Sequence, residues 1–524
     1  MNLTSIRRTI ISLRTSIELQ EILNSLRVFA ANEKSEEVLE TINIALQKSF
    51  DIEDKKSTVN ILELKIKQLF GSKKNMKQIE EHLFLMKQIA SNLDYQEGLI
   101  LAFSIEWGVE RFKGNEEKSL EALQKSMDLL EACSNCSCYT YNITHYSYAF
   151  DKWKRESDPN CACIFEECID YFERKGYYKG LIRALGYLST IYFQTQKRVG
   201  VQQLTKNIYR KLESLKLPKD LQAVMRYFLG ATLDLDFLLS KAEKQFLLSK
   251  KIFEASSPKS ENYVFYLPTL SHLSIIQALK GNLAESRRNI QLLEMILKKD
   301  SIINKLDNKN KEQTRHNLNL TKFYIKSRLK DFRSENEKDL VKTIFRNIDK
   351  CHTNAIFFSE FLLNANLNKE QLAEIKNLSN PSTKRVEHII NFLNEKTTNG
   401  DEKQIIDCIF TLNRRPLEDR MTFIEKAFAD LLAAQEYFKI NRFAEIYPLL
   451  RKYKNQLYKI EVLEMRVFME AFIQVGAYKN GNPLGPALQY MAIKKCRQYG
   501  FSRLENKLSD YLTLQGNDTI RMML

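Results

Sequence analysis

The residues with the clearest potential for chemistry are six cysteines in the first half of the chain. In order they are Cys133, Cys136, Cys138, Cys161, Cys163 and Cys168. The C-x2-C and C-x-C spacings of the first three are compatible with tetrahedral zinc coordination by thiolates. Cys161 and Cys168, however, are seven residues apart and share one helix face, where free cysteine packs as a small hydrophobic residue. We therefore expect a packing role and no bound metal, with a zinc site as the alternative.

Other constellations that would carry catalysis are missing from the sequence. The six histidines are scattered, and none forms an H-E-x-x-H motif or another metal-ligand pair. Gly180 and Gly186 are not followed by the Lys-Ser/Thr of a phosphate-binding loop, and no G-x-S-x-G nucleophile turn occurs. We expect no catalytic residue, no cofactor and no enzymatic activity.

The sequence contains a recurring pattern of helical hairpins. The pattern is clearest in two consecutive hairpins, residues 223–298. In each hairpin, a small residue on the leading helix precedes a small residue on the trailing helix by 12 positions. The pairs are Gly230 with Ala242 and Ser274 with Ser286. Small residues let two helices approach closely while large ones fill the remaining space, so the pattern indicates a helical repeat.

The small residue of the leading helix recurs along the chain. It is found at Gly108, Ala149, Ser189, Gly230 and Ser274, in steps of 41, 40, 41 and 44 residues. This alternation of large and small positions resembles the tetratricopeptide repeat, whose common form has 34 residues. The longer period resembles the long-repeat branch found in kinesin light chains and in some bacterial regulators. The resemblance covers about residues 96–298 and implies an all-α fold, a right-handed α-solenoid of tetratricopeptide-like hairpins.

Composition favours the same fold class. The chain has 524 residues, with 16 Gly, 9 Pro and 28% charged residues. Few helix breakers and many charges are typical of long helices, and a stack of hairpins can grow to this length because each unit packs on its neighbours. Spaced runs of Val, Ile and Thr between turn dipeptides, which would predict strands, are not found.

We expect four regions along the chain. Residues 1–95 form divergent N-terminal hairpins, with Ser35 as a helix start. Residues 96–298 form the repeat stack, residues 299–416 an irregular helical region, and residues 417–524 basic C-terminal hairpins. A polar stretch at the start of the third region predicts a long loop or a frayed helix end, so the chain is either one stack or two.

Charge is concentrated near the C-terminus. The chain carries a net charge of +15, and residues 451–507 contribute +7 of it, with 11 Lys and Arg against 4 Glu. We interpret this segment as a solvated face of long helices. The alternative is a regulatory protein that engages nucleic acid there, although no helix-turn-helix signature is present.

The apolar stretch after Arg7-Arg8 is too short for a signal-peptide core, and an odd cysteine count favours a reducing compartment, so we expect a cytoplasmic protein without a membrane span.

The resemblance implies that the leading helices line a concave surface. Residues expected on that surface and not needed for packing are Arg183, Thr190, Gln194, Tyr227, Asp234, Ser271 and His272. They would bind a partner peptide or helix, so we expect a non-catalytic protein-interaction scaffold or adaptor. A switch that senses a ligand or peptide is a further alternative. The chaperone-tail clamp of the family needs Lys and Asn at inner positions that carry Gly186, Tyr227 and Ser271 here, so that function is not expected.

Overall fold

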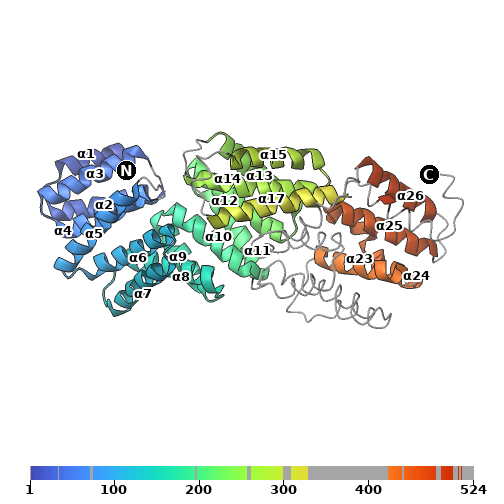
Figure 1. Ribbon diagram of the computed structural model, residues 1–524, viewed down its shortest axis with the longest axis horizontal. Coiled ribbons are helices and arrows are strands. Elements are labelled where there is room, and N and C mark those ends of the chain that lie inside the picture. Colours follow the sequence, from blue (N-terminus) through green and yellow to red (C-terminus); the bar gives the residue numbers. More distant parts are fainter. Residues whose placement is uncertain are drawn as a thin grey trace. The chain divides into compact units, whose positions relative to one another are not determined.

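A computed structural model shows that the chain is all-α. The structure describes residues 2–32, 35–70, 75–194, 198–256, 261–298, 308–328, 423–439, 442–479, 485–499, 505–506 and 509. Every regular element in these ranges is a helix, and consecutive helices pack on one another, so the predicted all-α solenoid is confirmed (Figure 1).

The contacts divide the chain into two compact units. Unit 1 comprises residues 1–228 and 256–263, and unit 2 comprises residues 229–255 and 264–524. The division falls inside helix α12 (Lys219–Leu235), between residues 228 and 229.

Unit 1 begins with five helices and continues as hairpins. The first five are α1 (Leu3–Ser12), α2 (Ser16–Asn32), α3 (Glu36–Asp51), α4 (Lys55–Leu69) and α5 (Met76–Asn92). The hairpin helices are α6 (Gln96–Lys113), α7 (Glu116–Ala132), α8 (Cys138–Glu156), α9 (Cys161–Lys175), α10 (Tyr178–Gln194) and α11 (Arg198–Ser214). Figure 1 shows them as neighbouring rods coloured blue to teal.

Short sequence features explain where two helices of unit 1 begin or end. Ser35 caps α3, because its side chain accepts a hydrogen bond from the Val38 N–H. Gly114 ends α6 with a left-handed φ of 87°, which glycine adopts without steric cost, and the chain then turns into α7. Helix α1 was not predicted; Ile6 and Ile10 on it are fully buried in the N-terminal core.

The spacing of 12 residues corresponds to a hydrogen bond across two of the described hairpins. The Ser119 hydroxyl donates to the Trp107 carbonyl at 3.2 Å, and the Ser286 hydroxyl donates to the Ser274 carbonyl at 2.6 Å. Side chains this small let the trailing helix reach the backbone of the leading helix. The repeat pattern thus has a direct physical basis in both units.

Unit 2 contains the last clear hairpin and a C-terminal group. Its helices are α13 (Leu239–Glu254), α14 (Tyr266–Leu279), α15 (Leu283–Leu297), α17 (Asn308–Arg328), α23 (Phe423–Lys439), α24 (Phe443–Leu450), α25 (Leu463–Lys479) and α26 (Gly485–Gln498). A short 3₁₀-helix, η2 (Glu261–Phe265), precedes α14. Ala434, Tyr437 and Leu450 contribute buried side chains to this C-terminal group.

In the described part of the C-terminal region, a 3₁₀-helix follows helix α24. Helix α24 contains Pro448 and gives way to a nine-residue 3₁₀-helix, η5 (Arg451–Lys459). Proline removes one hydrogen-bond donor and crowds the preceding turn, which explains why α24 ends so early. Most of region 299–416 lies outside the described residues.

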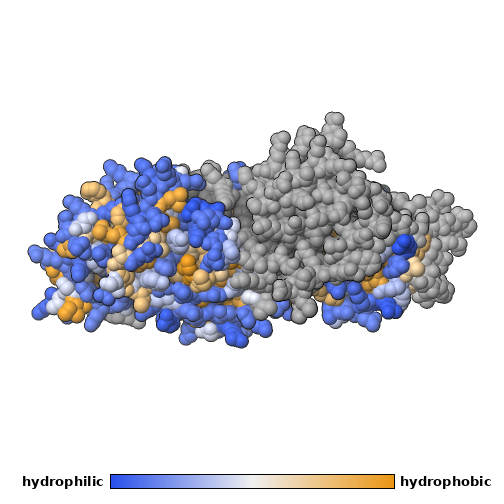
Figure 2. Space-filling view, turned by 90° about the horizontal axis from the view of Figure 1, so that it is seen from below, coloured by the Kyte–Doolittle hydropathy of each residue, from blue (hydrophilic) through white to orange (hydrophobic). Residues whose placement is uncertain are grey.

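The exposed surface of unit 1 carries few large apolar groups. Ile11, Ile17 and Phe84 are the most exposed among them. Figure 2 shows one face of the N-terminal part, where orange apolar spots are interspersed with hydrophilic blue. Among the described helices, none combines the length and the apolar character needed to cross a lipid bilayer.

Candidate functional site

The residues predicted to bind a partner are divided between the two units. Arg183, Thr190 and Gln194 lie on α10 and Tyr227 lies on α12, all in unit 1. Asp234, at the end of α12, and Ser271 and His272, on α14, belong to unit 2. The side chain of Gln194 lies outside the described part of the structure.

In unit 1 the described members of this set are half-buried. Arg183, Thr190 and Tyr227 each keep part of their surface accessible. The Thr190 hydroxyl donates to the Gly186 carbonyl at 3.0 Å, and the Tyr227 ring lies 5.2 Å from that of Phe228. Phe228 in turn sits against Gly186, where an added Cβ would lie 2.4 Å from the ring. These two leading helices therefore combine close packing with accessible polar and aromatic groups.

In unit 2 the expectation of exposed groove residues is wrong for two positions. Asp234 is 1% exposed and Ser271 is 2% exposed. A carboxylate oxygen of Asp234 lies 3.2 Å from Nδ1 of His272, whose ring stacks on Phe246 at 5.0 Å. These groups form an internal contact between α12 and α14, and only the half-buried His272 keeps accessible surface. Their sequence separation of 38 residues is close to one repeat, and that separation was the signal for side-by-side placement.

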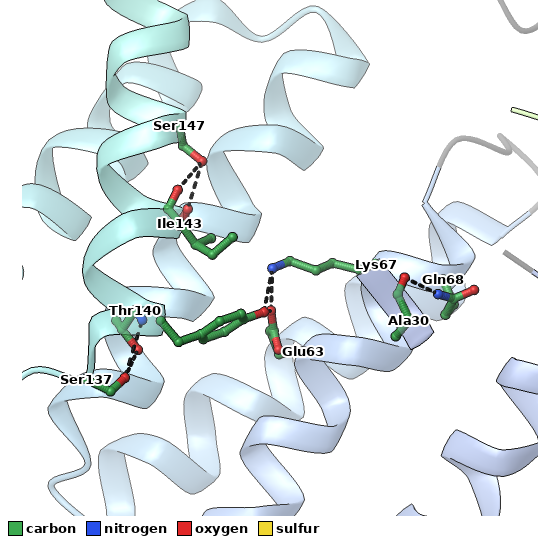
Figure 3. Close-up of polar contacts among 10 residues, drawn as sticks. Ala30, Glu63, Lys67, Gln68, Ser137, Thr140, Ile143 and Ser147 are labelled. Carbon is green, nitrogen blue, oxygen red and sulfur yellow. Dashed lines mark hydrogen bonds and ion pairs between the residues drawn. The ribbon is translucent and has the colours of Figure 1, made fainter. Parts of the chain in front are cut away.

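The sequence did not predict a buried polar cluster inside unit 1, which brings together helices distant along the chain. Glu63 on α4 is fully buried and accepts a hydrogen bond of 2.5 Å from the Tyr139 hydroxyl on α8. Lys67, one turn after Glu63, forms an ion pair with it and lies 3.1 Å from the same hydroxyl. Figure 3 shows the side chains of Glu63 and Lys67 converging beside α8.

Helix α2 completes the cluster. The guanidinium of Arg27 lies 4.4 Å from the centre of the Tyr139 ring, at cation–π distance. At the end of the helix, the Asn32 amide donates to the Gly176 carbonyl at 2.6 Å, and its oxygen accepts from the Lys179 N–H at 3.3 Å. Repeats in a solenoid usually contact only their neighbours, yet here α2 contacts the turn between α9 and α10.

The electrostatics of the cluster fit a structural role. Burial, together with the nearby Glu63 carboxylate, raises the pKa of Tyr139 well above its usual range, so this phenol stays neutral at neutral pH. Burial alone would lower the pKa of Arg27, but the negative charge of the nearby Glu63 carboxylate opposes this effect and the pKa is raised. The guanidinium therefore keeps its charge, and the cluster joins α2, α4 and α8 as an internal ion network.

The cysteines occupy the positions that the packing interpretation assigned to them. Cys161 and Cys168 are buried on α9, whereas Cys163 is exposed. Burial raises the pKa of Cys161 to about 11 and that of Cys168 to about 12, which disfavours the thiolate form that binds metal. Within the described residues, no three His, Cys, Asp or Glu side chains are grouped so that they could hold a metal ion.

We predict that protein purified under reducing conditions carries no zinc above background, measured by elemental analysis. The physical reason is that the buried thiols are neutral and act as small apolar groups. Binding of about one equivalent of zinc that is lost in the Cys133→Ser, Cys136→Ser double variant would contradict the prediction. Cys163→Ser, which changes an exposed cysteine, is the matched control.

Comparison with known proteins does not supply a family for this fold. No protein-family model matches the chain, and a search of curated proteins finds no significant match.

Proposed function

We propose that the protein is a non-catalytic interaction scaffold or adaptor that binds a partner peptide or helix on the leading helices of its tetratricopeptide-like repeats. The observation that carries this proposal is the half-burial of Arg183, Thr190 and Tyr227 on α10 and α12. These side chains are held by closely packed helices and still keep accessible surface. A rigid framework with accessible aromatic and cationic groups suits recognition of a peptide at low entropic cost.

The chemistry of these groups indicates the kind of partner segment. Tyr227 can supply an aromatic anchor and Arg183 can pair with an acidic group, and both residue types are enriched among binding hot spots. In unit 2, Asp234 and Ser271 are buried, whereas His272 keeps accessible surface. Cytoplasmic location is part of the proposal and is supported by the odd number of cysteines.

Photo-crosslinking in cells of the native host tests the proposal. A photoreactive phenylalanine analogue at Tyr227 should capture a discrete protein, identified by mass spectrometry. The matched control carries the analogue at Tyr209, an exposed tyrosine on the trailing helix α11, and should not capture that protein. Capture from the Tyr209 position alone would place binding on the trailing helices and overturn the assignment.

Substitution then measures the contribution of each side chain. Against the captured protein, Tyr227→Ala and Arg183→Ala are each expected to weaken binding on the order of 10-fold or more, the range of binding hot spots. Tyr209→Ala should bind at full affinity. If both groove variants bind as tightly as the parent, the leading helices are not the binding surface.

A further inference from the structure

The basic character of the C-terminal region is concentrated on one short element, η5. Its sequence contains Arg451, Lys452, Lys454 and Lys459 and no acidic residue. Two other cations of the region have acidic partners. Lys495 pairs with Glu470 at 2.9 Å and Arg497 pairs with Glu505 at 2.8 Å. The four cations of η5 lie within nine residues, which makes this element a dense positive segment.

One side of η5 is firmly attached to the rest of unit 2. Tyr453 is buried, and its hydroxyl donates to a carboxylate oxygen of Asp430 on α23 at 2.6 Å. The Tyr453 ring also contacts that of Phe423 edge-on at 5.6 Å, and Lys452 forms an ion pair with Asp430 at 2.6 Å. These contacts fix the orientation of the element, so its other side chains have a defined outward direction.

The opposite side of η5 is exposed. Arg451, Lys454 and Tyr458 are exposed there, Tyr458 by 73%. Lys459 is also exposed but lies at the edge of this side, with its Nζ 5.6 Å from the Phe423 ring and 5.9 Å from the Tyr458 ring. Among the described residues, no acidic side chain pairs with Arg451 or Lys454. A 3₁₀-helix has three residues per turn and rises about 2 Å per residue, so Arg451 and Lys454 lie on one line about 6 Å apart. Tyr458 lies on the adjacent line.

We propose that this η5 surface binds single-stranded nucleic acid. Cations with no acidic partner can neutralise backbone phosphates, and binding then releases counterions. The face of an exposed tyrosine can stack on an unpaired base, which a base-paired duplex does not offer in the same way. An acidic peptide would use the cations but would leave the aromatic face without a matching group. The combination of unpaired cations with an exposed tyrosine therefore favours a nucleic acid strand.

Binding of the full-length protein to a fluorescein-labelled oligodeoxythymidine, followed by fluorescence anisotropy over a salt series, tests the proposal. Three phosphate contacts predict a slope of about −2 for log K against log salt, which is a loss of about 20-fold between about 50 and 200 mM salt. The Arg451→Gln, Lys454→Gln double variant should reduce the slope to about −0.7. Tyr458→Ser should weaken binding on the order of 10-fold and leave the slope unchanged, because stacking involves no counterion.

The matched control is Lys241→Gln, Lys244→Gln, which removes the same charge from exposed positions of α13 in the same unit. It should leave both affinity and slope unchanged, and circular dichroism of all variants should match the parent. If the slope of log K against log salt decreases as much in the control variant as in the η5 variant, the effect depends only on the net charge of the protein, and the proposal is wrong. So would the absence of binding at low salt. Equal binding of a labelled polyglutamate peptide would assign the surface to an acidic protein instead.

Discussion

Replacing Glu63 by leucine is expected to lower the free energy of unfolding of unit 1 by about 3 kcal/mol, because cations would remain at the cluster without their carboxylate. Arg27 lies against the buried Tyr139 ring, and the Tyr139 hydroxyl would lose its acceptor. Lys67 is partly exposed and can reach water, which keeps the cost near the lower end of the range for broken buried ion pairs.

The chain offers a selective probe for this measurement. It has two tryptophans, Trp107 and Trp153, and both belong to unit 1. Urea unfolding followed by tryptophan fluorescence therefore reports on unit 1. The urea concentration at the midpoint of unfolding should be lower in the variant, and the slope of the free energy of unfolding against urea concentration should be the same. An equal slope shows that the two free energies of unfolding can be compared.

The matched control for Glu63→Leu is Glu106→Leu. Glu106 forms an ion pair of 2.5 Å with Lys87, also between two helices of unit 1, but both side chains are partly exposed. Such pairs contribute about 1 kcal/mol or less, so the control should shift the midpoint far less. If the two variants were equally stable, the Glu63 cluster would not stabilise the unit more than an ordinary surface pair does.

Replacing Gly230 by leucine is expected to destabilise unit 2 by about 1–3 kcal/mol through overpacking. A Cβ at this position would lie 2.9 Å from the ring of Phe246. Phe246 is fully buried and the ring of His272 stacks on it, so Phe246 cannot move aside without displacing other groups. The leading and trailing helices would have to separate.

Hydrogen–deuterium exchange with mass spectrometry locates this effect. Peptides from α13 should exchange faster in Gly230→Leu than in the parent, because the helix loses its close packing. Gly108→Ala is the control, since Gly108 holds the equivalent repeat position but a Cβ there would only reach Phe70 at 3.8 Å. Alanine should be neutral there or stabilise the helix by about 0.5–1 kcal/mol. Unchanged exchange in Gly230→Leu would show that the repeat position tolerates a large side chain.

The contact of α2 with the turn before α10 couples the unfolding of the N-terminal helices to that of later repeats. In an open stack, a terminal hairpin can unfold without affecting distant repeats. Asn32 instead ties the N-terminal helices to a turn 144 residues away, and Arg27 and Glu63 meet at Tyr139. We infer that the helices from α2 to α10 unfold together.

Much of the local structure was determined by the sequence alone. Helical periodicity and the recurring small residues predicted the hairpins, and Ser35 predicted a helix start. The burial of Cys161 and Cys168 also followed from their spacing. These features depend on side chains within one or two turns of each other, or on a fixed offset across one hairpin, and such relations are visible in the order of residues.

The tertiary structure decided which distant groups meet. Nothing in the residue order indicates that Glu63 pairs with Tyr139, 76 residues later. The spacing of 38 residues places Asp234 beside His272, but it does not show that the carboxylate is buried. Periodicity identifies the buried face of a helix, but it does not identify the helix that covers that face. The burial of a carboxylate and the location of unpaired cations on η5 depend on that long-range choice, so the polar contacts of this protein followed only from the folded chain.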